Sequence, residues 1–160
     1  MKIRRVQANN RKKSFVVQTS RRHFDFPYSK ALPKPTKTDP VSTVSVDPEL
    51  GREAFTYVLK SGREGSIHIE QVLDYNEDPG YMRDSILYKL TVEAQKRVEK
   101  SPLSRREIIH RLGTSATQFY RLLDQTNYKK SIDQLLLLLH VLDCSVELKV
   151  RSKASAGHAA

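Results

Sequence analysis

The first eighty residues alternate between short apolar runs and polar breaks, a pattern typical of β-strands. Four runs of strand length are rich in β-branched or aromatic residues: Ser14–Gln18, Val41–Val46, Ala54–Leu59 and Ser66–Gln71. In the last run, Ile67 and Ile69 fall on one face, and His68 and Glu70 on the other, as a half-buried antiparallel strand requires. Residues 60–65 contain two glycines, which suits a hairpin loop with a bulge between the last two runs.

The spacing of the apolar residues becomes helical after Asp78-Pro79-Gly80. They then recur at Met82, Ile86, Leu87, Leu90, Val92, Ala94 and Val98, until Pro102 ends the segment. Residues 29–40 contain three prolines and no periodicity, which indicates a loop. The pattern predicts an α+β fold, with a small antiparallel β-rich domain over 1–78, a helical domain over 79–150 and a disordered tail over 151–160. No internal repeat is visible.

The helical part carries three Ser-x-x-Glu/Gln boxes, each of which predicts a helix start. They are Ser104–Glu107, Ser115–Gln118 and Ser131–Gln134. In such a box the serine accepts a backbone N–H, and the Glu or Gln side chain reaches back to the N–H of the serine. Between the first two helices lies Leu112-Gly113-Thr114-Ser115, a glycine stop followed at once by a new cap. Two short helices joined by such a turn predict a helix-turn-helix.

The second of these helices has one apolar face and one polar face. Phe119, Leu122 and Leu123 share the inward face at i, i+3, i+4 spacing. The outward face has small or polar residues near its start, which lets a helix approach base edges in the major groove. The basic loop 126–131 follows and suits phosphate oxygens, and the helix that begins at Ser131 presents a positive dipole end to a second phosphate.

Charge favours an anionic partner. The chain has a net charge of +10, of which residues 1–30 contribute +8 and residues 101–130 contribute +4, while residues 51–80 contribute −3. The basic N-terminal stretch is either a nucleic-acid-binding arm or a strand edge that Lys and Arg protect against aggregation. The single cysteine, Cys144, fits a reducing cytoplasm, and no apolar run is long enough to span a membrane.

The run from Leu112 to Val146 (LGTSATQFYRLLDQTNYKKSIDQLLLLLHVLDCSV) resembles the lambda-repressor-like, Xre-type helix-turn-helix domain. The resemblance covers roughly residues 91–148. It implies DNA base contacts at Ser115, Ala116, Thr117, Tyr120 and Arg121. It implies backbone contacts at Ser104, Arg105, Lys129 and Lys130, and we add Arg106, its basic neighbour, to that set. The β-rich domain joined to it gives no function.

Three positions depart from the pattern of that family. Ile109 replaces a usual alanine, Thr114 replaces an apolar residue, and Asp143 replaces the glycine after the leucine-rich helix. Five consecutive leucines, 135–139, exceed what one small core uses. Leu136 and Leu137 therefore form a patch for either another part of this chain or a second copy, and a dimer would align two recognition helices.

No histidine pair, cysteine pair or glycine-rich loop indicates a metal, a cofactor or a catalytic centre, so we expect no enzyme. The sequence predicts a cytoplasmic bacterial transcriptional regulator that binds double-stranded DNA as a homodimer. Two alternatives stay open. One is an antitoxin-like protein whose β-domain binds a protein partner, and the other is an RNA- or protein-binding module with the helical part as scaffold.

Overall fold

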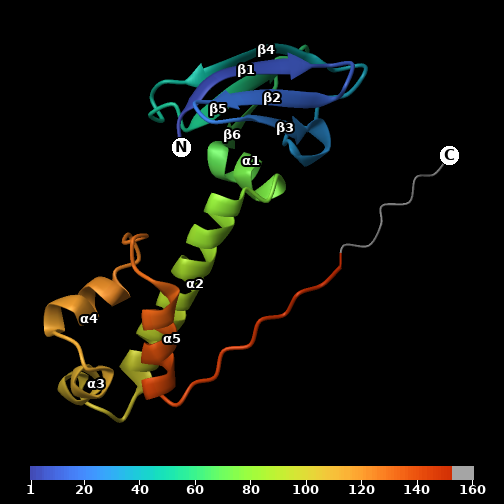
Figure 1. Ribbon diagram of the computed structural model, residues 1–160. Coiled ribbons are helices and arrows are strands. Elements are labelled where there is room, and N and C mark those ends of the chain that lie inside the picture. Colours follow the sequence, from blue (N-terminus) through green and yellow to red (C-terminus); the bar gives the residue numbers. More distant parts are fainter. Residues whose placement is uncertain (153–160) are drawn as a thin grey trace. The chain divides into compact units, whose positions relative to one another are not determined.

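Six β-strands and five α-helices make up the computed structural model, which describes residues 1–152 (Figure 1). The strands are β1 (Ile3–Asn9), β2 (Ser14–Thr19), β3 (His23–Pro27), β4 (Val41–Asp47), β5 (Ala54–Leu59) and β6 (Glu64–His68). The helices are α1 (Ile69–Tyr75), α2 (Pro79–Lys100), α3 (Arg105–Leu112), α4 (Ala116–Leu123) and α5 (Ile132–Val141), with a short 3-10 helix, η1 (Tyr28–Lys30). The contacts divide the chain into two units between Arg83 and Asp84, and the predicted α+β class is confirmed.

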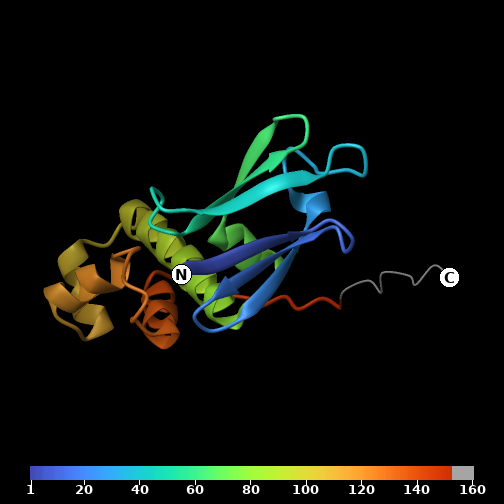
Figure 2. The same ribbon diagram turned by 90° about the horizontal axis from the view of Figure 1, so that it is seen from above.

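Two three-stranded antiparallel meanders, β1-β2-β3 and β4-β5-β6, form most of the first unit, with β1 lying beside β4 (Figure 2). The central strands of the two meanders, β2 and β5, have the same burial pattern, with the first, second, fourth and sixth residues buried. Both first strands also carry an irregularity near their start, after Ile3 and after Val41. The structure therefore contains a repeat that residue identity hides, since Val17 in β2 corresponds to Tyr57 in β5.

Aromatic rings form the centre of the core of this unit. The ring of Phe15 in β2 lies 5.1 Å from that of Phe55 and 5.0 Å from that of Tyr57, both in β5. The ring of Tyr28 also lies beside that of Phe15, at 4.7 Å. Tilted rings at such distances add about 0.5–1.5 kcal/mol per pair to the free energy of burial. The two meanders are thus held together by one aromatic cluster.

The strand predicted over Ser66–Gln71 is wrong beyond His68. His68 instead begins α1, because its Nδ1 accepts from the Glu70 N–H at 3.4 Å and its own N–H donates to Gln71 Oε1 at 2.9 Å. Alternation between Ile67 and Ile69 suited a strand. However, burial of Ile69, Val72 and Leu73 has the i, i+3, i+4 spacing of a helix.

The loop predicted over 29–40 is confirmed apart from η1, and side chains hold it in place. Tyr57 donates its hydroxyl to the Pro33 carbonyl at 2.6 Å, and Asp39 accepts from Arg63 at 2.8 Å. Gly65 in β6 allows the loop to approach the sheet. A Cβ there would lie 2.5 Å from Tyr57 Oη and 2.6 Å from the Leu32 carbonyl oxygen.

We expect Gly65→Ala to lower the free energy of unfolding of the first unit by about 1–3 kcal/mol, because a backbone carbonyl cannot move as a flexible side chain does. Urea unfolding followed by circular dichroism measures the change. The exposed neighbour Ser66 is the control, and Ser66→Ala is expected to leave stability almost unchanged. Equal stability of the two variants would contradict the tight approach of the loop.

The second unit has its own apolar core. Ile108 in α3, Phe119 in α4, and Leu135 and Leu138 in α5 are all fully buried. The expected helix over 79–100 is confirmed, but its inward face differs from the prediction. Met82 and Ile86 are 39% and 43% exposed, while the buried positions are Leu87, Thr91, Ala94 and Val98.

The last described residues are 151 and 152, so the predicted disordered tail falls almost wholly outside the described part of the chain. No helix within residues 1–152 has the length and apolar character needed to cross a membrane.

Candidate nucleic-acid interface

Helices α3 and α4 are joined by the tight turn 113–115. The Ser104 hydroxyl begins α3 by accepting the Glu107 N–H at 3.2 Å. At its end Gly113 has a φ of 66°, and the N–H groups of Gly113 and Thr114 donate to the carbonyls of His110 and Ile109. These two hydrogen bonds satisfy carbonyls at the end of the helix. They need a residue in the left-handed conformation, which glycine adopts without strain.

The fixed ends and the buried face of α4 determine which side chains it exposes. The Ser115 hydroxyl accepts the Gln118 N–H at 3.2 Å, so the serine bonds of the first two predicted boxes are confirmed. The return bond from Glu107 or Gln118 to the serine N–H forms in neither of these two boxes. Phe119 and Leu122 are buried, which leaves the opposite face to solvent. All five predicted base-contact residues are exposed on or just before this helix: Ser115, Ala116, Thr117, Tyr120 and Arg121. The ring of Tyr120 rests edge-on against Phe119 at 5.4 Å and is 52% exposed.

Side chains from α2 and from the loop after α4 satisfy the last three carbonyls of α4 and the carbonyl of its C-cap residue, Asp124. Asn127 donates to the Arg121 carbonyl at 3.2 Å, and Gln95 donates to that of Leu123 at 2.8 Å. Lys130 donates to the carbonyls of Leu122 at 3.0 Å and Asp124 at 2.6 Å. Unsatisfied carbonyls normally remain at a helix end. Here these bonds also hold the loop 124–131 against α4.

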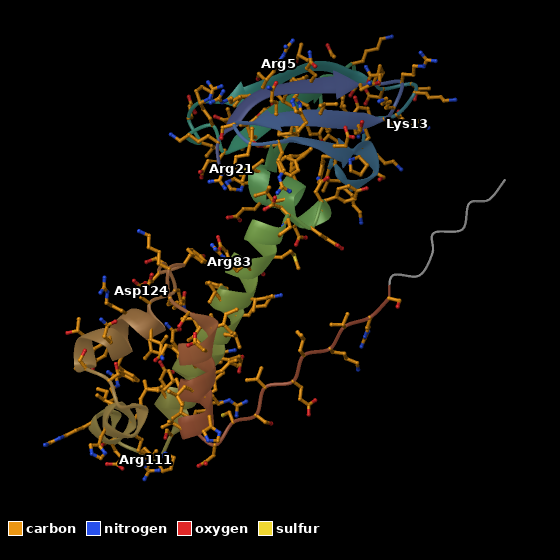
Figure 3. All side chains as sticks on the ribbon, in the orientation of Figure 1. Arg5, Lys13, Arg21, Arg83, Arg111 and Asp124 are labelled. Atoms are coloured by element: carbon orange, nitrogen blue, oxygen red, sulfur yellow. The ribbon has the colours of Figure 1, made fainter. Side chains whose placement is uncertain are left out.

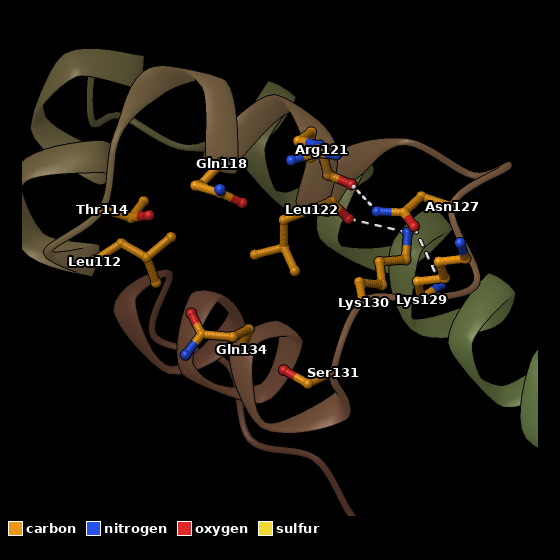
Figure 4. Close-up of a pocket in the computed structure, with 10 residues that line it drawn as sticks. All are labelled: Leu112, Thr114, Gln118, Arg121, Leu122, Asn127, Lys129, Lys130, Ser131 and Gln134. Atoms are coloured by element: carbon orange, nitrogen blue, oxygen red, sulfur yellow. Dashed lines mark hydrogen bonds between the residues drawn. The ribbon is translucent and has the colours of Figure 1, made fainter.

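A cavity of about 460 Å³ opens between α4, this loop and the start of α5 (Figure 4). Arg121 and Gln118 line it from α4, Lys129 and Lys130 from the loop, and Gln134 from α5. The lining contains no acidic residue. Guanidinium, ammonium and amide groups in one hollow can donate hydrogen bonds to an anion or to the edge of a base.

Several cations of this unit have no partner in the described chain. Within residues 1–152, no side-chain hydrogen bond or ion pair engages Arg105, Arg106, Arg121 or Lys129. Glu107, the acid of α3, is bound by Arg111 at 2.8 Å. The hydrogen bond from Arg111 holds the pKa of Glu107 below its ordinary value, so this carboxylate stays charged and already paired. The unpaired cations are therefore available to an external anion.

Lys130, which was predicted to contact the DNA backbone, binds the end of α4 in the structure. Its ammonium is bound to two carbonyls, and burial lowers its pKa, an effect that Asp124 partly reverses. A phosphate contact of Lys130 stays a prediction, but the structure gives this residue a capping role that the sequence analysis missed. The signal was present, since a lysine placed six residues after Asp124 can fold back onto a helix that ends without glycine.

We expect Lys130→Met to lower the free energy of unfolding of the helical unit by about 1–2 kcal/mol, because two charge-assisted hydrogen bonds are lost. Thermal unfolding measures the change. Lys129→Met is the matched control, and we expect it to leave the stability within about 0.5 kcal/mol, since exposed substitutions rarely change it more. Equal losses in the two variants would contradict the capping role.

The third serine box is confirmed as a helix start, because α5 begins at Ile132, but its capping bond is wrong. Ser131 precedes α5 but makes no capping bond with the helix backbone. The Asp133 carboxylate lies in the first turn of α5, and its interaction with the Ser131 hydroxyl, the largest cause, lowers the pKa of Asp133. The predicted phosphate site at the start of α5 thus already holds a negative charge.

Leu136 and Leu137 are 39% and 41% exposed, so the core of the helical unit uses neither of them. Ile132, one turn before Leu136 on α5, is 38% exposed and extends the same apolar patch. At the end of α5, Asp143 has a φ of 57° and occupies the left-handed position where the family pattern has glycine. Asp143 thus adopts the left-handed conformation that ends the helix, in place of the glycine of the family pattern.

Gln118, Asn127 and Gln134 also belong to the cavity, although the sequence analysis did not select them as site residues. Gln118 was assigned to a capping box. Its backbone N–H is capped, but its side-chain amide makes no hydrogen bond within the described chain. The face of α4 could have indicated it, because Gln118 and Arg121 are three residues apart and neighbours on a helix.

The basic N-terminal stretch is folded. Its residues belong to β1, β2 and their turns, and Arg5, Lys13 and Arg21 extend outward from the sheet (Figure 3). The stretch therefore forms strands, and the choice between a nucleic-acid-binding role and protective cations at a strand edge stays a prediction. Within the described residues, no group of three His, Cys, Asp or Glu side chains is placed to hold a metal ion.

Comparisons with protein-family models, with curated proteins and with solved structures found no match to this chain.

Proposed function

We propose that this chain is a sequence-specific double-stranded DNA-binding protein, a bacterial transcriptional regulator, in which α3, the turn 113–115 and α4 act as a helix-turn-helix. The observation that carries the proposal is the cavity beside α4. Two unpaired side chains suited to base edges, Arg121 and Gln118, line it together with the loop cation Lys129. Short residues, Ser115, Ala116 and Thr117, stand at the tip of α4, where bulk would block entry to a major groove.

In this proposal the contacts divide into two kinds. Arg121 and Gln118 read base edges, since Arg pairs bidentately with guanine and Gln with adenine. Thr117 contacts a thymine methyl or a base edge, and Tyr120 packs on sugar. Arg105, Arg106 and Lys129 contact phosphates, together with the Ser104 hydroxyl, and fix the register of the protein on the duplex.

A second copy completes the proposal. Leu136, Leu137 and Ile132 give the helical unit an exposed apolar patch, and pairing two such patches would present two α4 helices to one duplex. Sedimentation of wild type and a Leu136→Asp/Leu137→Asp variant tests this. We expect a dimer that the double substitution dissociates.

The experiment begins with selection of bound duplexes from a random pool, followed by titration at several salt concentrations. Four to six phosphate contacts per subunit predict a log–log slope of roughly −4 to −5. We expect Lys129→Ala to weaken binding to all duplexes alike and to reduce the slope by about 1. A change in base preference in this variant would show that the roles of the loop and of α4 are assigned wrongly.

Duplex RNA and single strands of the selected sequence are tested beside the DNA. DNA-specific binding supports the proposal. Equal or tighter binding of duplex RNA would overturn it in favour of an RNA-binding module, because A-form RNA hides the base edges of its major groove from a helix.

A further inference from the structure

The first unit contains a second cavity, remote in sequence from the candidate DNA interface. It has a volume of about 770 Å³ and lies between the β1–β2 turn, η1 and the loop that leads to β4. Ligand pockets in proteins usually measure about 300–1,000 Å³. Four of its lining residues are prolines or an aromatic residue, which we call the floor: Pro27, Tyr28, Pro35 and Pro40. Tyr28 is only 4% exposed.

Four cations surround this floor, and no acid lines the cavity: they are Arg11, Lys13, Lys34 and Lys37. None of the four forms an ion pair with a residue in 1–152. Elsewhere in this unit Arg63 binds Asp39 at 2.8 Å and Arg22 binds Asp78 at 3.4 Å. The cations at this cavity are therefore left unpaired in a unit where acids are available to others.

The walls of the cavity are fixed. Tyr28 donates its hydroxyl to Asn10 Oδ1 at 3.0 Å, and Asn10 donates to the Val41 carbonyl at 3.2 Å. Burial raises the pKa of Tyr28 to about 12, so its phenol adds no negative charge at neutral pH. The Thr36 N–H donates to the Asp39 carbonyl at 3.0 Å and closes the loop on the opposite side.

The backbone conformation of Lys13 suggests that its side chain, which lines the cavity, contacts a ligand. Its φ of 54° is left-handed, a conformation that favours Gly or Asn, and its carbonyl accepts the Tyr28 N–H at 2.9 Å. The turn would form more easily with Gly or Asn at this position, but the chain has a lysine there. Strained positions of this kind cluster at ligand sites.

From the apolar floor and its rim of unpaired cations, we infer that this cavity binds a small amphipathic anion, a molecule with an aromatic or aliphatic body and a carboxylate, sulfate or phosphate group. The body packs on Tyr28 and the prolines. The anionic group accepts hydrogen bonds from Lys13, Lys34 or Lys37. The inference is independent of DNA binding by the helical unit.

Anilinonaphthalene sulfonate is a suitable probe, because it joins an aromatic body to one anionic group. N-phenyl-1-naphthylamine has the same body without the sulfonate. Fluorescence titration of the full chain is expected to show saturable binding of the sulfonate to one site and binding of the neutral analogue at least about tenfold weaker.

Three variants locate the site. Lys34→Gln/Lys37→Gln is expected to weaken sulfonate binding about 30-fold, since each of the two exposed charges contributes about 1 kcal/mol at contact distance. Arg5→Gln/Lys60→Gln removes the same charge from the same unit outside the cavity and is expected to change binding less than twofold. Lys13→Asn is expected to weaken binding while the melting temperature stays equal or rises, because Asn tolerates the left-handed conformation better.

Amide chemical shifts in the bound state are expected to change at Ser29, Thr36 and Lys37. Three results would overturn the inference: equal affinity for the neutral analogue, an equal loss in the Arg5→Gln/Lys60→Gln control, or shifts confined to the helical unit. The first would indicate an apolar patch without charge recognition, and the second would indicate general attraction to a basic protein.

Discussion

Replacing Phe119 with alanine is expected to unfold most of the helical unit and leave the β unit folded. Phe119 is fully buried among residues of α3 and α5, and deletion of a core Phe costs about 3–5 kcal/mol. That loss is comparable with the entire stability of a small unit, since domains are stable by about 5–15 kcal/mol. The two cores share no residue, so the effect should remain in one half.

Two-dimensional NMR spectra measure this directly. In Phe119→Ala, resonances of residues 84–152 should collapse toward random-coil positions, while those of 1–83 keep their dispersion, and DNA binding should be lost. Phe55 is the matched control, because it is equally buried in the other core. In Phe55→Ala we expect the reverse, with DNA binding retained. Loss of both halves in either variant would contradict two separate cores.

Replacing Arg121 with alanine is expected to weaken binding to the selected duplex about 10- to 100-fold, and to relax base preference at one position. A bidentate pair to guanine contributes about 1–3 kcal/mol of discrimination. The fold should persist, because the Arg121 side chain has no partner within the described chain and is exposed. Arg121→Lys keeps the charge but loses the planar fork, so it should keep nonspecific affinity and lose specificity.

Arg111 provides the matched control for Arg121. It is an exposed arginine of the same unit, held by Glu107 at 2.8 Å on α3. Arg111→Ala is expected to change affinity by no more than about threefold and to leave base preference intact. Competition titrations with single-base variants of the selected duplex separate the two effects. If Arg111→Ala lost as much as Arg121→Ala, general electrostatic attraction would explain the binding.

Periodicity was sufficient to predict much of the fold. Runs of β-branched and aromatic residues located β2, β4 and β5, because such residues suit a pleated surface. The alternation of apolar and polar residues gave a wrong prediction at Ile69, because an apolar residue there fits the end of a strand and the start of a helix equally well. The capping ability of His68 decided between them, and histidine is not among the usual N-caps.

Local rules predicted the helix starts of α3 and α4 but not the bonds that place the loop after α4. Ser104 and Ser115 act on residues three positions away, so spacing alone reveals them. Lys130 and Gln95 act on α4 from other segments, and such contacts depend on tertiary folding. Ser131 makes no capping bond, although α5 begins directly after it, as its spacing predicted. The candidate DNA face could be predicted from helical spacing, because α4 has only about two helical turns and its buried residues determine which side is exposed.

The most direct test of the central claim is an NMR titration of the full chain with the selected duplex. The account predicts that amide resonances of Thr117, Gln118, Arg121 and Lys129 shift or broaden at one duplex per dimer, with smaller changes at Arg105. Failure to recover any preferred duplex, or changes restricted to residues 1–83, would contradict recognition of DNA by α4.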